Sequence, residues 1–175
     1  NTSSLKNNNN LRNFLAFFHY KGLGIGWHQG NRWWGPGIHT NLQMTNNTAP
    51  FPAQIIGTMK EIRIGKIGLL GLYTFSNLNN KKGSEAKYYT AFNGQLTWYG
   101  PLILSLGFSR NYLTGGASIS GYNWTEEDAR KIIFEGIFTS NLIDSEYTVG
   151  GHDLWDQQIS GYLSIILPKR NLKIY

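Results

Sequence analysis

The chain lacks cysteine and has little charge. Without cysteine it cannot form disulfide frameworks, thiolate nucleophiles, Cys-ligated zinc sites or iron–sulfur clusters. Charged residues make up 15% of its 175 residues, against about 25% in ordinary soluble chains. A charged helical protein and a disordered charged tail are therefore both excluded. Its polarity comes from Asn, Gly, Ser, Thr and Tyr, as suits a β-protein with one face against something apolar.

Long hydrophobic runs are also missing. No apolar run approaches the roughly 18 residues of a transmembrane helix, and no basic segment followed by an apolar one opens the chain as a signal peptide would. The first ten residues, 1–10, are low in complexity and polar, which predicts a loop. We see no repeat and no linker, so residues 1–175 are expected to belong to one domain.

The net charge is +6, from 16 Lys and Arg against 10 Asp and Glu. These basic residues are scattered, the largest cluster being Lys169-Arg170 with Lys173, and no nucleic-acid recognition motif accompanies them. We therefore expect no nucleic-acid partner. A diffuse positive charge fits a surface that meets an acidic glycan or an anionic lipid.

Alternation with a period of two residues dominates the chain and predicts β-strands. It is clear in Leu23–His28, Tyr88–Trp98, Leu102–Tyr112 and Trp155–Leu167, and weaker in Ile67–Phe75. Several of these runs have about 9–11 residues, the length with which a tilted strand crosses a bilayer. Tyr88 and Trp98 share one face at the spacing of the two aromatic girdles of an outer-membrane barrel. A soluble β-sandwich with one buried and one wet face explains the alternation equally well.

One segment, residues 126–139, predicts a short amphipathic helix. Thr125 and Asp128 have the spacing of a capping box. Apolar residues then follow at helical spacing to about Thr139. We expect this helix to pack on or inside the β-structure.

Few residues carry a recognisable catalytic or metal-binding pattern. None of the four histidines has metal-ligand spacing, and no nucleotide or hydrolase motif occurs, so we expect no metal, no cofactor and no enzyme activity. The carboxylate pairs Asp144/Glu146 and Asp153/Asp156 have the residue types of a glycosidase. Solvated loop acids are the simpler interpretation of both.

The segment 28–52 carries the most distinctive chemistry. Its candidate binding residues are His28, Asn31, Arg32, Trp33, Trp34, Asn46 and Asn47. Two adjacent Trp side chains offer broad apolar faces on which a sugar ring can lie. Arginine brings a planar fork of donors, and the Asn amides can donate and accept. The segment is therefore suited to polysaccharide binding, or alternatively to plugging the inside of a β-structure.

The same residues resemble the Wzi family of capsule-assembly proteins. Its signature is similar to Arg32-Trp33-Trp34-Gly35-Pro36-Gly37, followed by Thr45-Asn46-Asn47 and by Pro50 and Pro52. Leu104–Gly116 and Asp156–Tyr175 resemble later parts of the family more loosely.

The resemblance implies an antiparallel outer-membrane β-barrel of eighteen strands with helical pieces. It implies a non-enzymatic lectin on the bacterial cell surface that holds capsular polysaccharide. Because the chain offers only about seven or eight strand candidates, we expect a middle fragment of such a barrel. The expected partners are acidic capsular polysaccharide and outer-membrane lipid, with the barrel monomeric. The rival functions are a porin-like channel and a soluble β-sandwich enzyme acting on glycans.

Overall fold

The computed structural model describes residues 13–30, 50–82, 85–115, 124–134, 148–149, 152–153 and 155–174. The strands are β1 (Phe14–Tyr20), β2 (Leu23–Gln29), β3 (Pro52–Thr58), β4 (Ile62–Ile64), β5 (Ile67–Asn77), β6 (Lys87–Tyr99), β7 (Ile103–Gly115), β8 (Thr148–Val149), β9 (His152–Asp153), β10 (Trp155–Leu167) and β11 (Leu172–Ile174). The helices are α1 (Glu126–Lys131) and the 3₁₀ turns η2 (Ile132–Phe134) and η4 (Pro168–Arg170).

Nine strands form one antiparallel sheet, which confirms the all-β prediction. Its order is β1-β2-β3-β5-β6-β7-β10-β11, with β4 paired to β5 beside β3. The hairpin β8–β9 is a separate two-stranded sheet. Within the described residues the large sheet is open, with β1 and β11 at its two edges. It has more than the seven or eight strands expected, since β4 and β11, at three residues each, are too short to show alternation.

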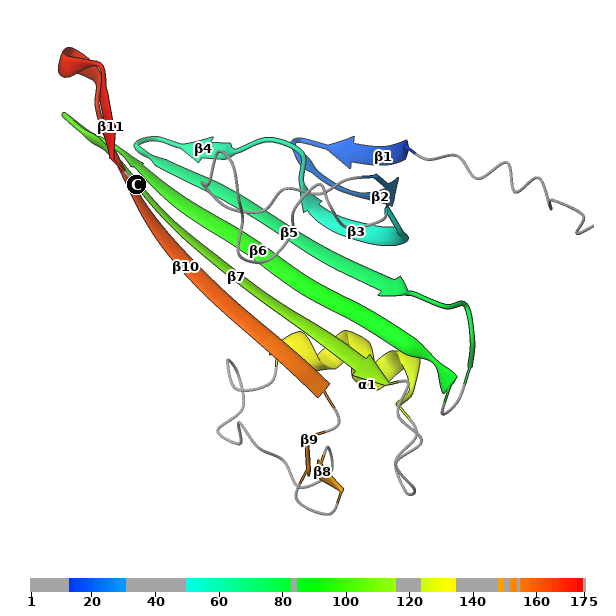
Figure 1. Ribbon diagram of the computed structural model, residues 1–175. Coiled ribbons are helices and arrows are strands. Elements are labelled where there is room, and N and C mark those ends of the chain that lie inside the picture. Colours follow the sequence, from blue (N-terminus) through cyan, green and yellow to red (C-terminus); the bar gives the residue numbers. More distant parts are fainter. Residues whose placement is uncertain are drawn as a thin grey trace, which may run out of the picture.

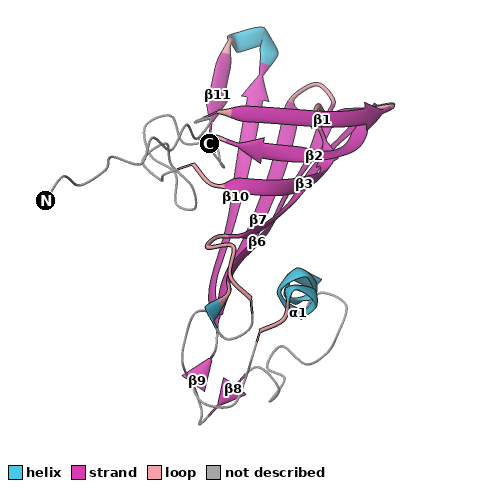
Figure 2. Ribbon diagram, turned by 90° about the vertical axis from the view of Figure 1, so that its right-hand side faces the viewer, coloured by secondary structure: helices cyan, strands magenta, loops and turns pink. Residues whose placement is uncertain are grey.

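The long strands β5, β6, β7 and β10 run side by side along the molecule (Figure 1). Figure 2 shows β1, β2 and β3 lying across the direction of β7 and β10, so the sheet is strongly twisted. The observed β10 has the predicted bounds, and β6 extends its predicted run by one residue at each end. Strand β7 begins one residue later and ends three residues later than predicted. The hairpin β1–β2 turns at Lys21 and Gly22, both of which have positive φ (50° and 91°), as a tight hairpin turn requires.

One face of the sheet, here called the apolar face, carries the side chains on the same side as Leu106. Directly opposed residues of antiparallel strands share a face, so this face includes Leu163, Leu96 and Leu69 in one row across β10, β7, β6 and β5. Of the 23 exposed large hydrophobic residues, 18 lie on the apolar face, three on the opposite face and two outside strands. Most of the exposed hydrophobic residues are thus gathered on one side.

The opposite face, here called the polar face, carries small and hydrogen-bonding side chains. On β7 it presents Ser105, Gly107 and Ser109 between the exposed apolar residues. Tyr162 of β10 extends over Gly107, where a Cβ would fall inside its ring, and its hydroxyl donates to Oε1 of Gln95 at 2.6 Å. The aromatic ring therefore fills the space that the glycine leaves.

The helix α1 packs against the apolar face at one end of the long strands, as predicted (Figure 1). Both bonds of the predicted capping box between Thr125 and Asp128 are present. The α-helix ends at Lys131 and continues as the 3₁₀ turn η2, while residues 135–139 of the predicted helix lie outside the described residues.

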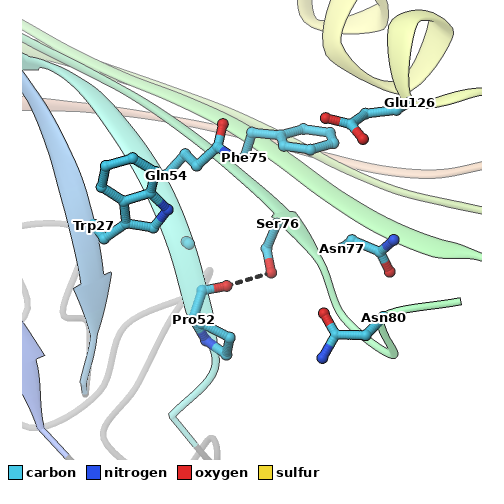
Figure 3. Close-up of a pocket in the computed structure, with 9 residues that line it drawn as sticks. Trp27, Pro52, Gln54, Phe75, Ser76, Asn77, Asn80 and Glu126 are labelled. Carbon is cyan, nitrogen blue, oxygen red and sulfur yellow. Dashed lines mark hydrogen bonds between the residues drawn. The ribbon is translucent and has the colours of Figure 1, made fainter.

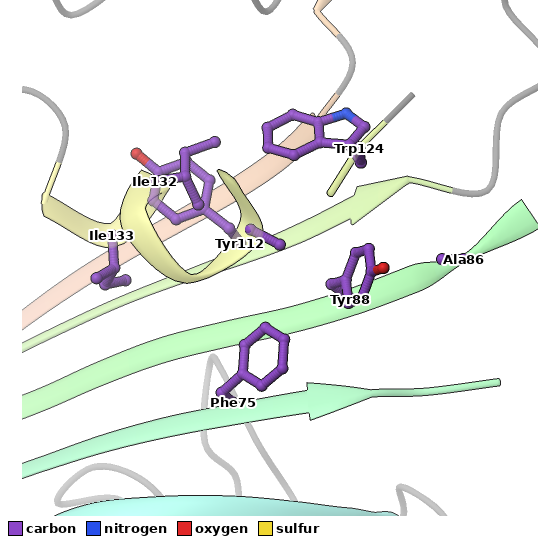
Figure 4. Close-up of a cluster of buried hydrophobic side chains, with 8 residues drawn as sticks. Phe75, Ala86, Tyr88, Tyr112, Trp124, Ile132 and Ile133 are labelled. Carbon is purple, nitrogen blue, oxygen red and sulfur yellow. The ribbon is translucent and has the colours of Figure 1, made fainter. Parts of the chain in front are cut away.

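Beneath the helix lies the main hydrophobic cluster. It comprises Phe75, Ala86, Tyr88, Tyr112, Trp124, Ala129, Ile132 and Ile133, which are drawn in Figure 4. This corrects the prediction that Tyr88 and Trp98 form two exposed girdles. Tyr88 is 4% exposed because α1 covers it, whereas Trp98 is 37% exposed.

Candidate functional site

The candidate site lies where β3 and β5 separate. Their ladder ends at the pair Gln54–Phe75; beyond it Pro52 pairs with β2 and Asn77 pairs with β6. The Ser76 hydroxyl donates to the Pro52 carbonyl oxygen at 2.5 Å and holds the two strands together across this fork (Figure 3). A pocket of about 190 Å³ opens in the fork, here called the fork pocket.

Five elements or loops contribute to the fork pocket. Its lining residues are Trp27, Pro52, Ala53, Gln54, Phe75, Ser76, Asn77, Asn80 and Glu126. The Trp27 indole, 52% exposed, comes from β2, and Glu126 comes from the first turn of α1 (Figure 3).

An ion pair forms the helix side of the pocket. Arg130 Nη2 lies 2.5 Å from Glu126 Oε1 and also donates to Gln54 Oε1 at 2.9 Å. Its guanidinium stacks over the Phe75 ring, 3.7 Å from the centroid. Since Glu126 is balanced by Arg130, this wall carries little net charge, and hydrogen bonding rather than ionic attraction would govern a ligand here.

Asn77 brings an acceptor to the same pocket. Its Nδ2 donates to the Lys81 carbonyl oxygen at 2.8 Å. Its Oδ1 is buried and has no hydrogen-bond partner among the described residues. A buried acceptor without a partner costs free energy, and a ligand hydroxyl donating to Asn77 Oδ1 would remove that cost.

Three side chains of the sheet hold the helix, and with it Glu126, in place. Thr90 Oγ1 donates to the Ala129 carbonyl at 2.5 Å, and the Tyr73 hydroxyl donates to the Arg130 carbonyl at 3.1 Å. Arg110 Nη1 donates to the Ile133 carbonyl at 3.3 Å. These bonds satisfy carbonyls near the C-terminal end of a helix that is too short to be stable alone.

Arg110 is a buried charge at this junction, only 4% exposed. It donates to the Tyr112 hydroxyl. With the Gln157 amide turned so that its oxygen faces the guanidinium, that oxygen accepts from Arg110 Nε at 2.6 Å and Nη2 at 2.8 Å. The guanidinium is thus held by hydrogen bonds from two strands and from the helix, as a buried charge requires.

Of the seven candidate binding residues in the segment 28–52, His28 is the one that the structure describes. It lies on β2, opposite Ala53 of β3 and on the polar face. Its neighbour Trp27 points to the other face and lines the fork pocket, whereas His28 is not among the lining residues. The others, Asn31, Arg32, Trp33, Trp34, Asn46 and Asn47, lie outside the described residues.

The signature segment nevertheless has both ends beside the fork pocket. β2 ends at Gln29 and β3 begins at its partner Pro52, so the chain leaves and rejoins the sheet next to Trp27. Sequence reasoning missed Trp27, Gln54, Asn77 and Glu126 as site residues. Trp27 stood in a recognised alternating run, but a strand pattern does not distinguish a wall residue from a pocket residue.

Comparison of the chain with protein-family models, with curated proteins and with solved structures yields no match. The described residues contain no helix long and apolar enough to cross a membrane. Nor do those residues hold a cluster of three or more His, Asp or Glu side chains able to bind a metal ion. Function must therefore be argued from the two faces of the sheet and from the fork pocket.

Proposed function

We propose that the chain is part of the wall of a bacterial outer-membrane β-barrel, and that the protein is a non-enzymatic surface lectin that binds capsular polysaccharide. The observation that supports the membrane part is the exposed apolar face. Leu106 is 57% exposed, Leu163 48% and Leu96 46%, in one continuous row. Exposed apolar patches of more than a few hundred Å² are rare on soluble monomers.

The two faces have the division of side chains that a membrane strand needs. Lipid-facing residues are apolar and lumen-facing residues are polar, in strict alternation. On β7, Leu104, Leu106 and Phe108 alternate with Ser105, Gly107 and Ser109. In lipid the backbone groups must be satisfied within the sheet, and β7 is paired on both sides along most of its length.

Strand length supports the same assignment. The 13 residues of β6, β7 or β10 extend about 44 Å at about 3.4 Å per residue. Tilted by about 40°, they rise about 34 Å against an apolar band of about 25 Å. About 9 Å of strand then projects beyond the lipid.

The lectin part of the proposal rests on the fork pocket and on the resemblance of residues 28–52 to the Wzi family. Trp27 offers an exposed indole face to the C–H side of a sugar ring, and Asn77 Oδ1 offers an acceptor for a hydroxyl. Arg32, Trp33 and Trp34 belong to the connection between β2 and β3, whose two ends lie beside this pocket. A polymer with repeated units gains avidity from several weak contacts.

Titration of the full-length protein in detergent with purified acidic capsular polysaccharide tests the lectin function. Trp27→Ala is expected to weaken binding at least about tenfold, equivalent to about 1.4 kcal/mol. The matched control Trp98→Ala removes a 37% exposed indole from the other end of the sheet and should leave affinity unchanged. Trp33→Ala with Trp34→Ala tests the signature segment. Absence of binding by the unmodified protein would overturn the lectin function.

A porin-like channel is the second candidate, favoured by the hydroxyl and amide groups on the polar face. Gln95, Thr97 and Ser105 form a hydrogen-bonded group there, with Gln95 Nε2 donating to Thr97 Oγ1 at 3.0 Å. Single-channel conductance in planar bilayers distinguishes the two functions. Stable ion conductance without polysaccharide affinity would replace the lectin by a channel.

A further inference from the structure

Positive charge is concentrated at one end of the strands, here called the short-turn edge. At this end lie the short turns that join β1–β2, β4–β5, β6–β7 and β10–β11, together with the residues leading into β4. Its segments 19–23, 58–67, 99–103 and 167–173 hold seven of the 16 Lys and Arg residues and one of the ten acids. The seven cations are Lys21, Lys60, Arg63, Lys66, Lys169, Arg170 and Lys173.

All seven of these side chains are exposed. The Arg63 guanidinium lies 3.9 Å from the centroid of the Tyr99 ring, and its Nε donates to the Gly65 carbonyl at 3.1 Å. The one acid of this edge, Glu61, accepts from the Tyr99 hydroxyl. Its charge is thereby directed at a phenol rather than at the surrounding cations.

The opposite edge has a different charge balance. Three ion pairs of the described residues, Lys81–Glu85, Arg130–Glu126 and Lys131–Glu127, all lie there. Cations and acids at that edge therefore neutralise each other in part, whereas the short-turn edge carries an excess of about six positive charges.

The short-turn edge also borders the apolar face directly. Ile64 and Ile67, 67% and 37% exposed, belong to the apolar face and stand next to Arg63 and Lys66 in the same hairpin. Trp98, opposite Ile67, places an indole at this border. Aromatic residues are typical of the level where hydrocarbon meets head groups, and lysine and arginine side chains reach from there toward the polar layer.

Connection lengths distinguish the two edges in the same way. The turns at the short-turn edge span two to four residues between paired strands, whereas β2 and β3 are joined by 22 residues and β5 and β6 by nine at the other edge. In outer-membrane barrels the short turns face the periplasm and the long loops face outward. The fork pocket, at the edge with long connections, would then face the exterior.

We propose that the short-turn edge binds the phosphate groups of anionic phospholipids in the periplasmic leaflet. The inference rests on the proposed function, since it requires the apolar face to lie in lipid. A lysine or arginine near an anionic surface contributes about 1 kcal/mol, which corresponds to about a fivefold preference per cation. The arrangement orients the protein in the bilayer and anchors the end of the sheet away from the fork pocket.

The test measures lipid selectivity of the protein in phosphatidylcholine vesicles with spin-labelled lipids. Labelled phosphatidylglycerol is expected to associate with the protein about fivefold more strongly than labelled phosphatidylcholine, and the preference should fall in 1 M salt, where the Debye length is about 3 Å. The variant Lys60→Gln/Arg63→Gln/Lys66→Gln removes three of the seven cations and should reduce the preference. The variant Lys169→Gln/Arg170→Gln/Lys173→Gln probes the second cluster and serves if the first fails to fold.

A control with the same net charge separates this edge from general electrostatics. Lys81→Gln/Lys82→Gln/Lys131→Gln removes three cations from the opposite edge and should keep the lipid preference. Equal loss in the control and in the test variants would overturn the proposal, as would no preference in the unmodified protein. If the protein restricts the motion of labelled phosphatidylcholine but shows no preference for phosphatidylglycerol, only the phosphate site is refuted. If it restricts the motion of no labelled lipid, the membrane assignment itself is refuted.

Discussion

Leu106→Arg is expected to destabilise the protein in a bilayer by about 2–3 kcal/mol, because an arginine on the lipid face costs about 2–4 kcal/mol at the midplane and about 0–1 near the interfaces. The depth follows from the strand. Leu106 stands three residues after Ile103, the first residue of β7, which is about 10 Å along the strand at about 3.4 Å per residue. With a tilt of about 40° its depth is about 8 Å, roughly two thirds of the way to the middle of an apolar band of about 25 Å.

The expected loss of stability differs clearly between a leucine that faces lipid and one that faces water. Leu106 is 57% exposed, so in water its replacement would stay within about ±0.5 kcal/mol, as for most surface substitutions. Two further arginine variants serve as controls. Ile64→Arg lies on the apolar face at the short-turn edge, where about 0–1 kcal/mol is expected. Leu113→Arg lies on the polar face of the same strand and is 42% exposed, so little change is expected.

Denaturant titration of the protein refolded into vesicles, followed by tryptophan fluorescence, measures the three free energies of unfolding. The expected order of destabilisation is Leu106→Arg well above Ile64→Arg and Leu113→Arg. If all three values agree within about 0.5 kcal/mol, the measure for an ordinary surface change, the apolar face does not lie in hydrocarbon and the membrane argument is wrong.

Three more predictions follow from individual contacts. Gly107→Ala should lower the free energy of unfolding by about 1–3 kcal/mol through overpacking, because the added methyl group would enter the ring of Tyr162. Gly161→Ala is the control in the same unfolding assay, since its Cβ would meet its nearest atom at 3.6 Å. Arg110→Leu should lower the free energy of unfolding by about 2–4 kcal/mol, because it leaves the buried partners of Arg110 unsatisfied. Hydrogen exchange should show faster opening of α1. Unchanged protection of the helix amides would contradict the role of Arg110 in holding the helix on the sheet. Lys81 donates to the Glu85 carboxylate and lowers its pKa, so the pair is intact above the ordinary carboxyl range and is lost as the pH falls through the lowered pKa. An NMR titration of Lys81→Gln should therefore show the Glu85 pKa rising toward its ordinary value, and an unchanged pKa would exclude the pair in solution.

Much of the fold could be predicted because strand alternation is a local property. β10, β6 and β7 appear where the period-two runs predicted them, and the capping box at Thr125 predicted the start of α1. Strands β1 and β3 were not among the runs named from the sequence. Strands β4 and β11 were also missed, since their three residues show no period. The candidate site was harder to predict from the sequence. Gln54 and Glu126 are 72 residues apart in the chain and meet only because β3 and α1 both pack at the fork.

The sequence by itself determined that this is an antiparallel β-protein without thiol chemistry, and it determined which side chains share a face. Those properties depend on composition and on the two-residue period of a strand, which needs no knowledge of the neighbours. Only the tertiary structure decided that Tyr88 lies beneath α1 while Leu106 remains exposed, although both belong to one alternating face. The reason is that coverage depends on where a distant helix docks, and the docking of α1 is set by Thr90, Tyr73 and Arg110. Strand pairing likewise gathered seven scattered cations at one edge, which no local pattern in the chain records.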